Sequence, residues 1–183
     1  MDTTVRTRTT FTEYSALPET NQIVELIDGE IVMNPPLFRH QKTLLAIIGS
    51  LLPFQEVGQL CIAPSGLHLD EANSFEPDLF WVRHDSPTCF LEANGRYWHG
   101  APDLVVEVLS PSTAYEDRSV KFDRYQAIGV REYWIVDPEA LFVEVYTHNG
   151  AHFERGGVFK AGQSFACAAL NNAPIDLSSW FTG

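Results

Sequence analysis

Residues 102–110, with the sequence PDLVVEVLS, form an apolar run that nevertheless contains two acids, Asp103 and Glu107. The length of the run and its content of β-branched residues predict a strand. Alternate side chains of a strand point to opposite faces, so both acids share one face. The other face is apolar and consists of Leu104, Val106 and Val108. A fold that contains this strand must bury the valine-rich face and must also accommodate two carboxylates on the reverse side.

Two interpretations of the acidic face remain open. The face could be solvated, as one face of an antiparallel sheet often is. Alternatively, the strand is covered on both sides. Its carboxylates are then paired, hydrogen-bonded or bound to a metal ion, because an unpartnered buried charge is costly.

The order of the other elements predicts an α/β protein with a central mixed sheet flanked by helices and with β-hairpins added at both ends. Apolar periodicity and turn residues give the elements. In chain order they are a helix at 10–17, a hairpin at 23–33, a helix at 40–55, strands at 60–69, 77–82 and 102–110, a helix at 113–127, a strand at 131–137, a hairpin at 141–159 and a docking segment at 173–181. The segment between 83 and 101 is expected to be a loop.

Particular residues mark the ends of these elements. Asp28-Gly29 is the expected two-residue turn of the first hairpin, and Asn149-Gly150 is expected at the turn of the last one. Thr10 or Thr12 is expected to cap the first helix. Ser112 is the candidate cap of the helix at 113–127, and Gly129 supplies its C-terminal signal.

Length and composition restrict the class of protein. We expect one domain over residues 1–183, with residues 1–9 flexible. No window approaches the ~20 apolar residues of a membrane helix. The N-terminus lacks the apolar core of a signal peptide, so the expected location is cytoplasmic. The three cysteines show no zinc spacing and are expected to be reduced and buried. The net charge of -12 argues against broad, nonspecific binding of phosphates, although a local basic site or a metal-mediated contact would still be compatible with it.

If the acids bind a metal ion, a second strand must contribute a ligand. Residues four apart on a strand are separated by roughly 13 Å, so Asp103 and Glu107 cannot hold the same ion without a bend. The run at 77–82 offers Asp78, and neighbouring strands lie about 4.8 Å apart. Asp78 beside Glu107 would present oxygen ligands of the kind that Mg²⁺ prefers.

Lys121 is a candidate third member of such a site. If the helix at 113–127 returns antiparallel to the strand, Lys121 lies about 12 Å back from the turn, at 1.5 Å per residue. Glu107 lies about 10 Å back along the strand, so the two side chains could be level. The alternative is a surface pair with Asp117, four residues earlier on the helix. Two acids and a lysine around a metal ion would suit the cleavage of a phosphodiester.

These motifs resemble the Uma family of restriction-endonuclease-like proteins, in the PD-(D/E)XK nuclease superfamily. The resemblance extends from about Phe11 to Phe181 and includes ELIDGE, EPDLFWV, PDLVVEVLSPST and GVREYWIVDP. It implies a restriction-endonuclease-like core and a divalent metal ion, Mg²⁺ with Mn²⁺ as the alternative, held by Asp78 and Glu107. The superfamily lysine two residues after the acid is absent, because Leu109 stands there. Lys121 is expected to take its place.

Further roles remain open. Glu25 or Glu30 of the ELIDGE segment could add a ligand, and Glu25 is preferred. Asp103 could orient Lys121, contact a second ion or cap the strand. His40 could carry protons, but a solvent-exposed histidine is the expectation. Tyr97, Trp98 and His99 could stack on a nucleobase or simply anchor their loop.

The resulting functional hypothesis is a Mg²⁺-dependent endonuclease that hydrolyses DNA, with Asp78, Glu107, Lys121, Asp103 and Glu25 as candidate catalytic residues. DNA is the expected partner, no membrane is expected, and a homodimer would suit cleavage of both strands. Two alternatives are kept. One is a non-catalytic nucleic-acid-binding or regulatory module with the same fold. The other is a metal-dependent hydrolase of a small phosphorylated substrate.

Overall fold

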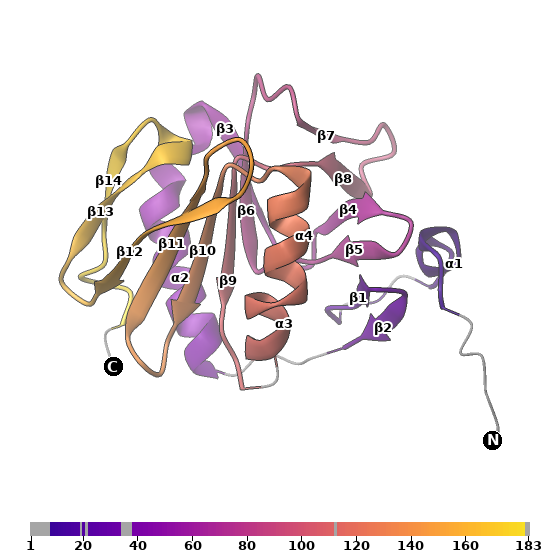
Figure 1. Ribbon diagram of the computed structural model, residues 1–183, viewed down its shortest axis with the longest axis horizontal. Coiled ribbons are helices and arrows are strands. Elements are labelled where there is room, and N and C mark those ends of the chain that lie inside the picture. The colour runs from indigo at the N-terminus through magenta and orange to yellow at the C-terminus, as the bar shows by residue number, and fades with distance from the viewer. Residues whose placement is uncertain (1–7, 19, 21, 34–37, 112, 182–183) are drawn as a thin grey trace.

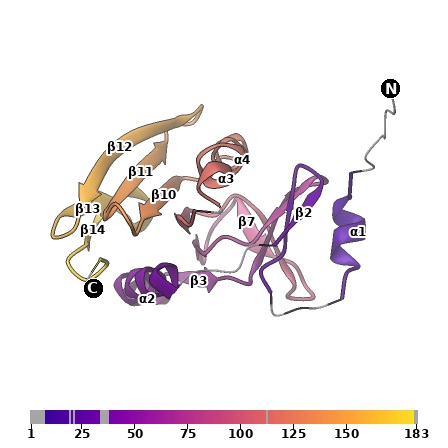
Figure 2. The same cartoon turned by 90° about the horizontal axis from the view of Figure 1, so that it is seen from below.

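The computed structural model describes residues 8–18, 20, 22–33, 38–111 and 113–181 (Figure 1). Helices lie on both sides of a central mixed sheet, which confirms the predicted fold class. The N-terminal elements lie at one end of the molecule and the C-terminal strands at the other, as both views show (Figures 1 and 2). None of the described helices is long and apolar enough to cross a bilayer.

Six of the described strands form the central sheet. Their order is β12 (Phe153–Lys160), β11 (Phe142–His148), β10 (Glu132–Asp137), β9 (Leu104–Val108), β6 (Leu79–Arg83) and β3 (Gly58–Ile62). β9 and β10 are parallel, and the other neighbouring pairs are antiparallel. A parallel pair needs a crossover connection, and helices α3 (Ala114–Arg118) and α4 (Val120–Ile128) provide it.

The two faces of this sheet are covered by different elements. Helix α2 (Phe38–Leu51) and the C-terminal pair β13 (Ser164–Cys167) and β14 (Ala173–Asp176) pack on one face. Helix α4 packs on the other face, together with strands of a second sheet. Figure 1 accordingly shows α2 behind the central strands and α3 and α4 in front of them.

Strand β9 is therefore buried on both sides. Leu104, Val106 and Val108 belong to the apolar cluster under α2, as predicted for the valine-rich face. Val105 belongs to the cluster under α4. Glu107 lies on the same face, and only 2% of this residue is exposed. The solvated interpretation of the acidic face is wrong, so Glu107 needs buried partners.

The sequence did not reveal the second sheet. Its order is β2 (Glu30–Val32), β1 (Glu25–Ile27), β5 (Asn73–Phe75), β4 (Gly66–Asp70), β8 (Tyr97–Gly100) and β7 (Cys89–Leu91). The expected single strand at 60–69 is two strands that belong to different sheets. The expected loop at 83–101 contains β7 and β8. These strands are three to five residues long, which is too short for a clear alternating pattern.

Most of the predicted element ends are confirmed. Thr10 caps α1 (Phe11–Ser15) through a capping box, and Asp28 and Gly29 form the β1–β2 turn with positive φ. Gly129 ends α4 in the left-handed conformation. The helix expected at 113–127 is instead broken at Ser119 into α3 and α4. Helix α2 ends at Leu51, and a 3₁₀ turn (Leu52–Glu56) continues over Pro53.

Several expectations concern residues at the margins of the described chain. Ser112 and residues 1–7 lie outside it. Within it, the Thr9 backbone N–H donates to the Gly29 carbonyl at 2.9 Å, so the chain is attached from that point. Cys61, Cys89 and Cys167 are free and buried, as predicted.

Candidate active site

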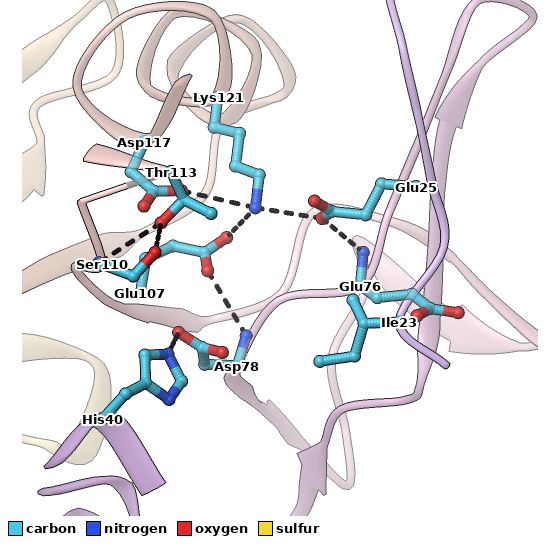
Figure 3. A pocket seen from close by; sticks show the side chains of 10 residues that line it. All are labelled: Ile23, Glu25, His40, Glu76, Asp78, Glu107, Ser110, Thr113, Asp117 and Lys121. Carbon is cyan, nitrogen blue, oxygen red and sulfur yellow. Dashed lines mark hydrogen bonds and ion pairs between the residues drawn. The ribbon is translucent and has the colours of Figure 1, made fainter. Parts of the chain in front are cut away.

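A small cavity of about 30 Å³ lies where β1, the start of α2, the entrance to β6, the end of β9 and helices α3 and α4 meet (Figure 3). It is large enough to hold a water molecule or a small ion. Its lining residues are Ile23, Glu25, His40, Glu76, Asp78, Glu107, Ser110, Thr113, Asp117 and Lys121. Five of them are acids, whereas one is a lysine and one a histidine.

Sheet register brings Asp78 and Glu107 together. Leu79 pairs with Val106 across the antiparallel β6–β9 ladder, which places Asp78 beside Glu107. The Asp78 N–H donates a long hydrogen bond to Glu107 Oε2 at 3.4 Å. The Val108 N–H donates to Asp78 Oδ2 at 2.8 Å. The predicted pairing of these two acids across neighbouring strands is confirmed.

Lys121 extends from α4 into the group of acids. Its Nζ lies 3.0 Å from Glu25 Oε1, 3.1 Å from Glu107 Oε1 and 3.4 Å from Asp117 Oδ1. The residue is 4% exposed, and Asp117 is 1% exposed. Lys121 is therefore level with Glu107, as the helix rise predicted. The alternative of an exposed Asp117–Lys121 pair is wrong, because the second sheet covers this face of the helix.

The two acids of the ELIDGE segment lie differently. Glu25 is 6% exposed, and its Oε1 accepts a hydrogen bond from the Glu76 N–H at 2.9 Å as well as contacting Lys121. Glu30 is exposed on β2 and does not line the cavity. The hairpin turn reverses the chain between them, so only Glu25 reaches the site.

His40 is 6% exposed, which contradicts the expectation of a solvent-exposed histidine. Its Nε2 lies 2.9 Å from Asp78 Oδ2, and Figure 3 shows the ring beside that carboxylate. The first turn of α2 packs over the entrance to β6, and this packing buries the ring. His40 therefore fixes the orientation of Asp78 together with the Val108 N–H.

Asp103 lies at the opposite end of β9 and is not among the residues that line the cavity. Its Oδ2 accepts a hydrogen bond from the Arg83 N–H at 3.0 Å. This contact fits the third role considered for it, the cap at the entry of the strand. The structure brings together Asp78, Glu107, Lys121 and Glu25, and it leaves Asp103 apart.

Burial and mutual repulsion shift the ionisation of the site. Burial raises the pKa of Glu107 well above its ordinary value, although Lys121 opposes the shift. Burial likewise raises the pKa of Asp117 to about 6 and that of Glu76 to about 7. For Lys121, burial alone would lower the pKa, but Glu107, Glu25 and Asp117 outweigh it and raise the pKa, so the amine stays protonated.

The residues present fit a divalent cation by charge and by donor type. Five acids and one ammonium group line the cavity, and carboxylate oxygens are the ligands that Mg²⁺ prefers. Among the described residues, no group of three or more His, Cys, Asp or Glu side chains is arranged to hold an ion unaided. Mg²⁺ is usually bound through one or two carboxylates, with waters and substrate phosphates as its remaining ligands.

The hydrogen bonds show which oxygens remain for such an ion. Glu107 Oε1 accepts from Lys121 Nζ and from the Tyr125 hydroxyl, the latter at 2.8 Å. Its Oε2 receives only the long contact from the Asp78 N–H among the described residues. The short bonds to Asp78 both fall on Oδ2. Glu107 Oε2 and Asp78 Oδ1 are therefore the candidate ligand atoms.

Sequence reasoning did not assign Asp117, Tyr125 or Glu76 to the site, although it named Asp117 as a possible surface partner of Lys121. Asp117 and Tyr125 lie four residues before and after Lys121, so helical spacing places all three on one side of α3 and α4. That spacing was the available signal, but it does not say whether the face is covered. Glu76 precedes the Pro77-Asp78 pair, and no pattern in the sequence marks it.

Comparison with known proteins gives one family and one fold. The model of the Uma2 family, described as "Putative restriction endonuclease", matches residues 11–177. A crystal structure described as a "putative nuclease belonging to DUF820" from Anabaena variabilis ATCC 29413 is similar, with a TM-score of 0.75. The two chains are 21% identical, and the match covers 94% of this chain and 97% of the other. No curated protein matches the sequence. At this level of identity, the crystal structure supports the fold alone.

Proposed function

The chain belongs to the Uma2 family of restriction-endonuclease-like proteins, and we propose that it is a metal-dependent endonuclease that hydrolyses DNA phosphodiester bonds. One observation carries this proposal. Asp78, Glu107 and Lys121, from two adjacent strands and the following helix, line the same cavity, with Glu25 completing the contacts of the lysine. The same three residue types support phosphodiester cleavage when they surround a metal ion.

Asp78 and Glu107 would hold the ion, Mg²⁺ or Mn²⁺. A bound divalent cation would neutralise phosphate charge and favour the formation of hydroxide from water. The chain itself supplies the orientation of the ligands. His40 and the Val108 N–H fix Asp78 Oδ2, while Tyr125 and Lys121 fix Glu107 Oε1.

Lys121 is the group available to act on the substrate. Its ammonium is positioned by Glu25 and Asp117 as well as by Glu107, which restricts its movement to the cavity. A phosphate oxygen that enters the cavity would meet this fixed positive charge, and the charge developing on the phosphate during attack would be stabilised there. Cleavage of both DNA strands would need two such sites, so we expect a homodimer.

The experiment is cleavage of supercoiled plasmid with Mg²⁺, with Mn²⁺ and with a chelator. The proposal predicts nicked and linear products with either metal ion and none with the chelator. Asp78→Asn is the decisive variant, and it should remain folded because the amide oxygen can still accept from the Val108 N–H. Cleavage by this variant at the wild-type rate would refute the assignment of the metal site.

The net charge of -12 favours a second candidate, a metal-dependent hydrolase of a small phosphorylated compound. Such an enzyme would need no extended basic surface. It would hydrolyse a nucleotide or an aryl phosphate diester while leaving plasmid DNA intact. Assay of both substrate classes with the same preparation separates the two candidates.

A further inference from the structure

A groove of about 910 Å³ adjoins the candidate active site, and no step of the proposed reaction uses it. Its described lining includes Leu17, Gln22, Ile31, Met33, Arg96 and Tyr97. Glu76 lines both the groove and the cavity. Figure 3 shows its carboxylate pointing away from Lys121. The groove and the cavity are therefore neighbours with Glu76 at their border, and the Glu76 carboxylate accepts a hydrogen bond from the Val24 N–H at 3.0 Å.

The wall of the groove includes an aromatic ring that is held in place. Tyr97 pairs with Gly66 across the parallel β4–β8 ladder. A Cβ added at Gly66 would lie 2.5 Å from the Tyr97 ring, so the ring lies directly against the glycine backbone. The Arg96 guanidinium lies 5.5 Å from the ring centroid. The Trp98 ring contacts Phe80 instead, and the His99 ring contacts His68.

The lip of the groove is apolar. Leu17 is 42% exposed, Ile31 is 40% exposed and Met33 is 59% exposed. Thr20 and Gln22 add hydrogen-bonding side chains, and Arg96 is the single basic residue in the part of the lining that the structure describes. A flat apolar ligand with polar edges would suit this combination of an aromatic wall, an apolar lip and two neutral polar groups.

The charge of the groove argues against duplex DNA as its occupant. A duplex backbone is held by several Lys and Arg side chains, and this groove offers one arginine and one glutamate. Single-stranded nucleic acid can instead bind through stacking of its bases on aromatic side chains. An unpaired base in the groove would lie next to the cavity, because Glu76 lines both.

We propose that the groove binds an unpaired nucleobase next to the scissile phosphate, so that the substrate is single-stranded DNA or DNA with an extruded nucleotide. This inference rests on the proposed nuclease function, because it assigns the substrate class of the same site. Tyr97 is the stacking residue, and an entering base displaces the Arg96 guanidinium that lies over its ring. The apolar lip of Leu17, Ile31 and Met33 covers the base.

The test is fluorescence anisotropy with a fluorescein-labelled 16-nucleotide single strand and with its 16-base-pair duplex, in Ca²⁺ to limit cleavage. We expect the single strand to bind at least about 5-fold more tightly than the duplex. Tyr97→Leu should weaken binding of the single strand by roughly 5- to 100-fold. The matched control is Phe90→Leu, which removes an aromatic ring from β7 of the same sheet. Phe90 is 62% exposed and lies outside the groove, so this variant should bind the single strand as the wild type does.

A second variant keeps the test decisive if Tyr97→Leu fails to fold. Leu17→Glu places an acid on the exposed lip and should also weaken binding of the single strand. Its control is Leu141→Glu, at a position of equal exposure on another part of the surface. Wild-type affinity in the Leu17 variant, or equal binding of duplex and single strand, would overturn the inference. Failure of both oligonucleotides to bind would also overturn it.

The outcome is separable from that of the proposed function. Plasmid cleavage with binding that does not depend on Tyr97 and Leu17 would reject the groove and keep the nuclease. Binding that depends on both residues, without cleavage of any DNA by the wild type in Mg²⁺ or Mn²⁺, would keep the groove and reject the nuclease.

Discussion

Two glutamates, Glu107 on β9 and Glu132 on the adjacent strand β10, are both buried and have raised pKa values, yet their surroundings differ. The described partners of Glu132 are neutral donors: Trp134 Nε1 at 2.6 Å, the Ala169 N–H at 2.8 Å and Cys167 Sγ at 3.5 Å. Glu107 instead faces a cavity with four other acids and a lysine. Burial raises the pKa of both, so a raised pKa does not by itself identify a functional acid.

The difference lies in what each set of contacts leaves unsatisfied. Both oxygens of Glu132 are hydrogen-bonded within an apolar cluster, and this arrangement ties the C-terminal segment to the sheet. Around Glu107, the negative charges outnumber the positive ones, and the excess is tolerable only with protonation or with a bound cation. The first arrangement stabilises the fold, whereas the second costs stability and favours the binding of a cation.

The largest effect is expected from Lys121→Met. Removal of the amine leaves buried carboxylates without their counter-ion, which should lower the free energy of unfolding by about 3–5 kcal/mol and abolish cleavage. Urea denaturation measures the loss. Lys42→Met, at an exposed position of α2, is the control and should change stability by less than about 0.5 kcal/mol. Equal effects of the two variants would mean that the buried ion pairs are not formed.

Asp78→Asn and Glu107→Gln should each reduce the rate of plasmid cleavage at least about 100-fold, since changes in groups that merely orient metal ligands already cost 10- to 100-fold. Glu132→Gln should cleave at a rate within about 3-fold of the wild type at 25 °C, because Glu132 lies on the other face of the sheet. Loss of cleavage in all three variants would show that burial, and not the cavity, makes these acids necessary.

The same pair of glutamates should give the opposite ranking in stability. Glu132→Gln leaves either Trp134 Nε1 or the Ala169 N–H facing an amide donor, which should cost about 1–3 kcal/mol. Glu107→Gln removes one charge from an excess of like charges and keeps an acceptor for the Tyr125 hydroxyl. It should therefore be at least as stable as the wild type without metal. Thermal unfolding in a chelator measures both, and a large loss in the Glu107 variant would contradict this account.

The smallest effect is expected at Glu144, which contacts Arg118 at 2.9 Å and the Tyr146 hydroxyl at 2.7 Å. Burial would raise the pKa of Glu144, but these two hydrogen bonds outweigh it and lower the pKa. The contribution of Glu144 to stability is therefore present at neutral pH and is lost as the pH falls through the lowered pKa.

Glu144→Gln should lower the free energy of unfolding at pH 7 by about 1 kcal/mol or less and have a smaller effect at pH 3. Urea denaturation at the two pH values gives both differences. A larger loss at pH 3 than at pH 7 would reverse the sign and would contradict the lowered pKa.

Local geometry made part of the site predictable. The two-residue period of β9 separated its faces, and the rise per residue of a strand and of a helix placed Lys121 level with Glu107. The burial of His40 and Asp117 was not predictable in this way. It depends on what packs against α2 and against α3 and α4, and the strands that cover Lys121, such as β1 and β5, are too short to show periodicity. Asp103 shares a face with Glu107, but the length of the strand separates it from the cavity.

Calorimetric titration with Mn²⁺ or Mg²⁺ tests the central claim most directly. It measures cation binding to the cavity lined by the buried acids and needs no assumption about the substrate. The account predicts that the wild type and Glu132→Gln bind the ion with the same stoichiometry, whereas Glu107→Gln does not bind it. Equal binding of the ion by wild type and Glu107→Gln would contradict the claim that the cavity beside β9 is a metal site.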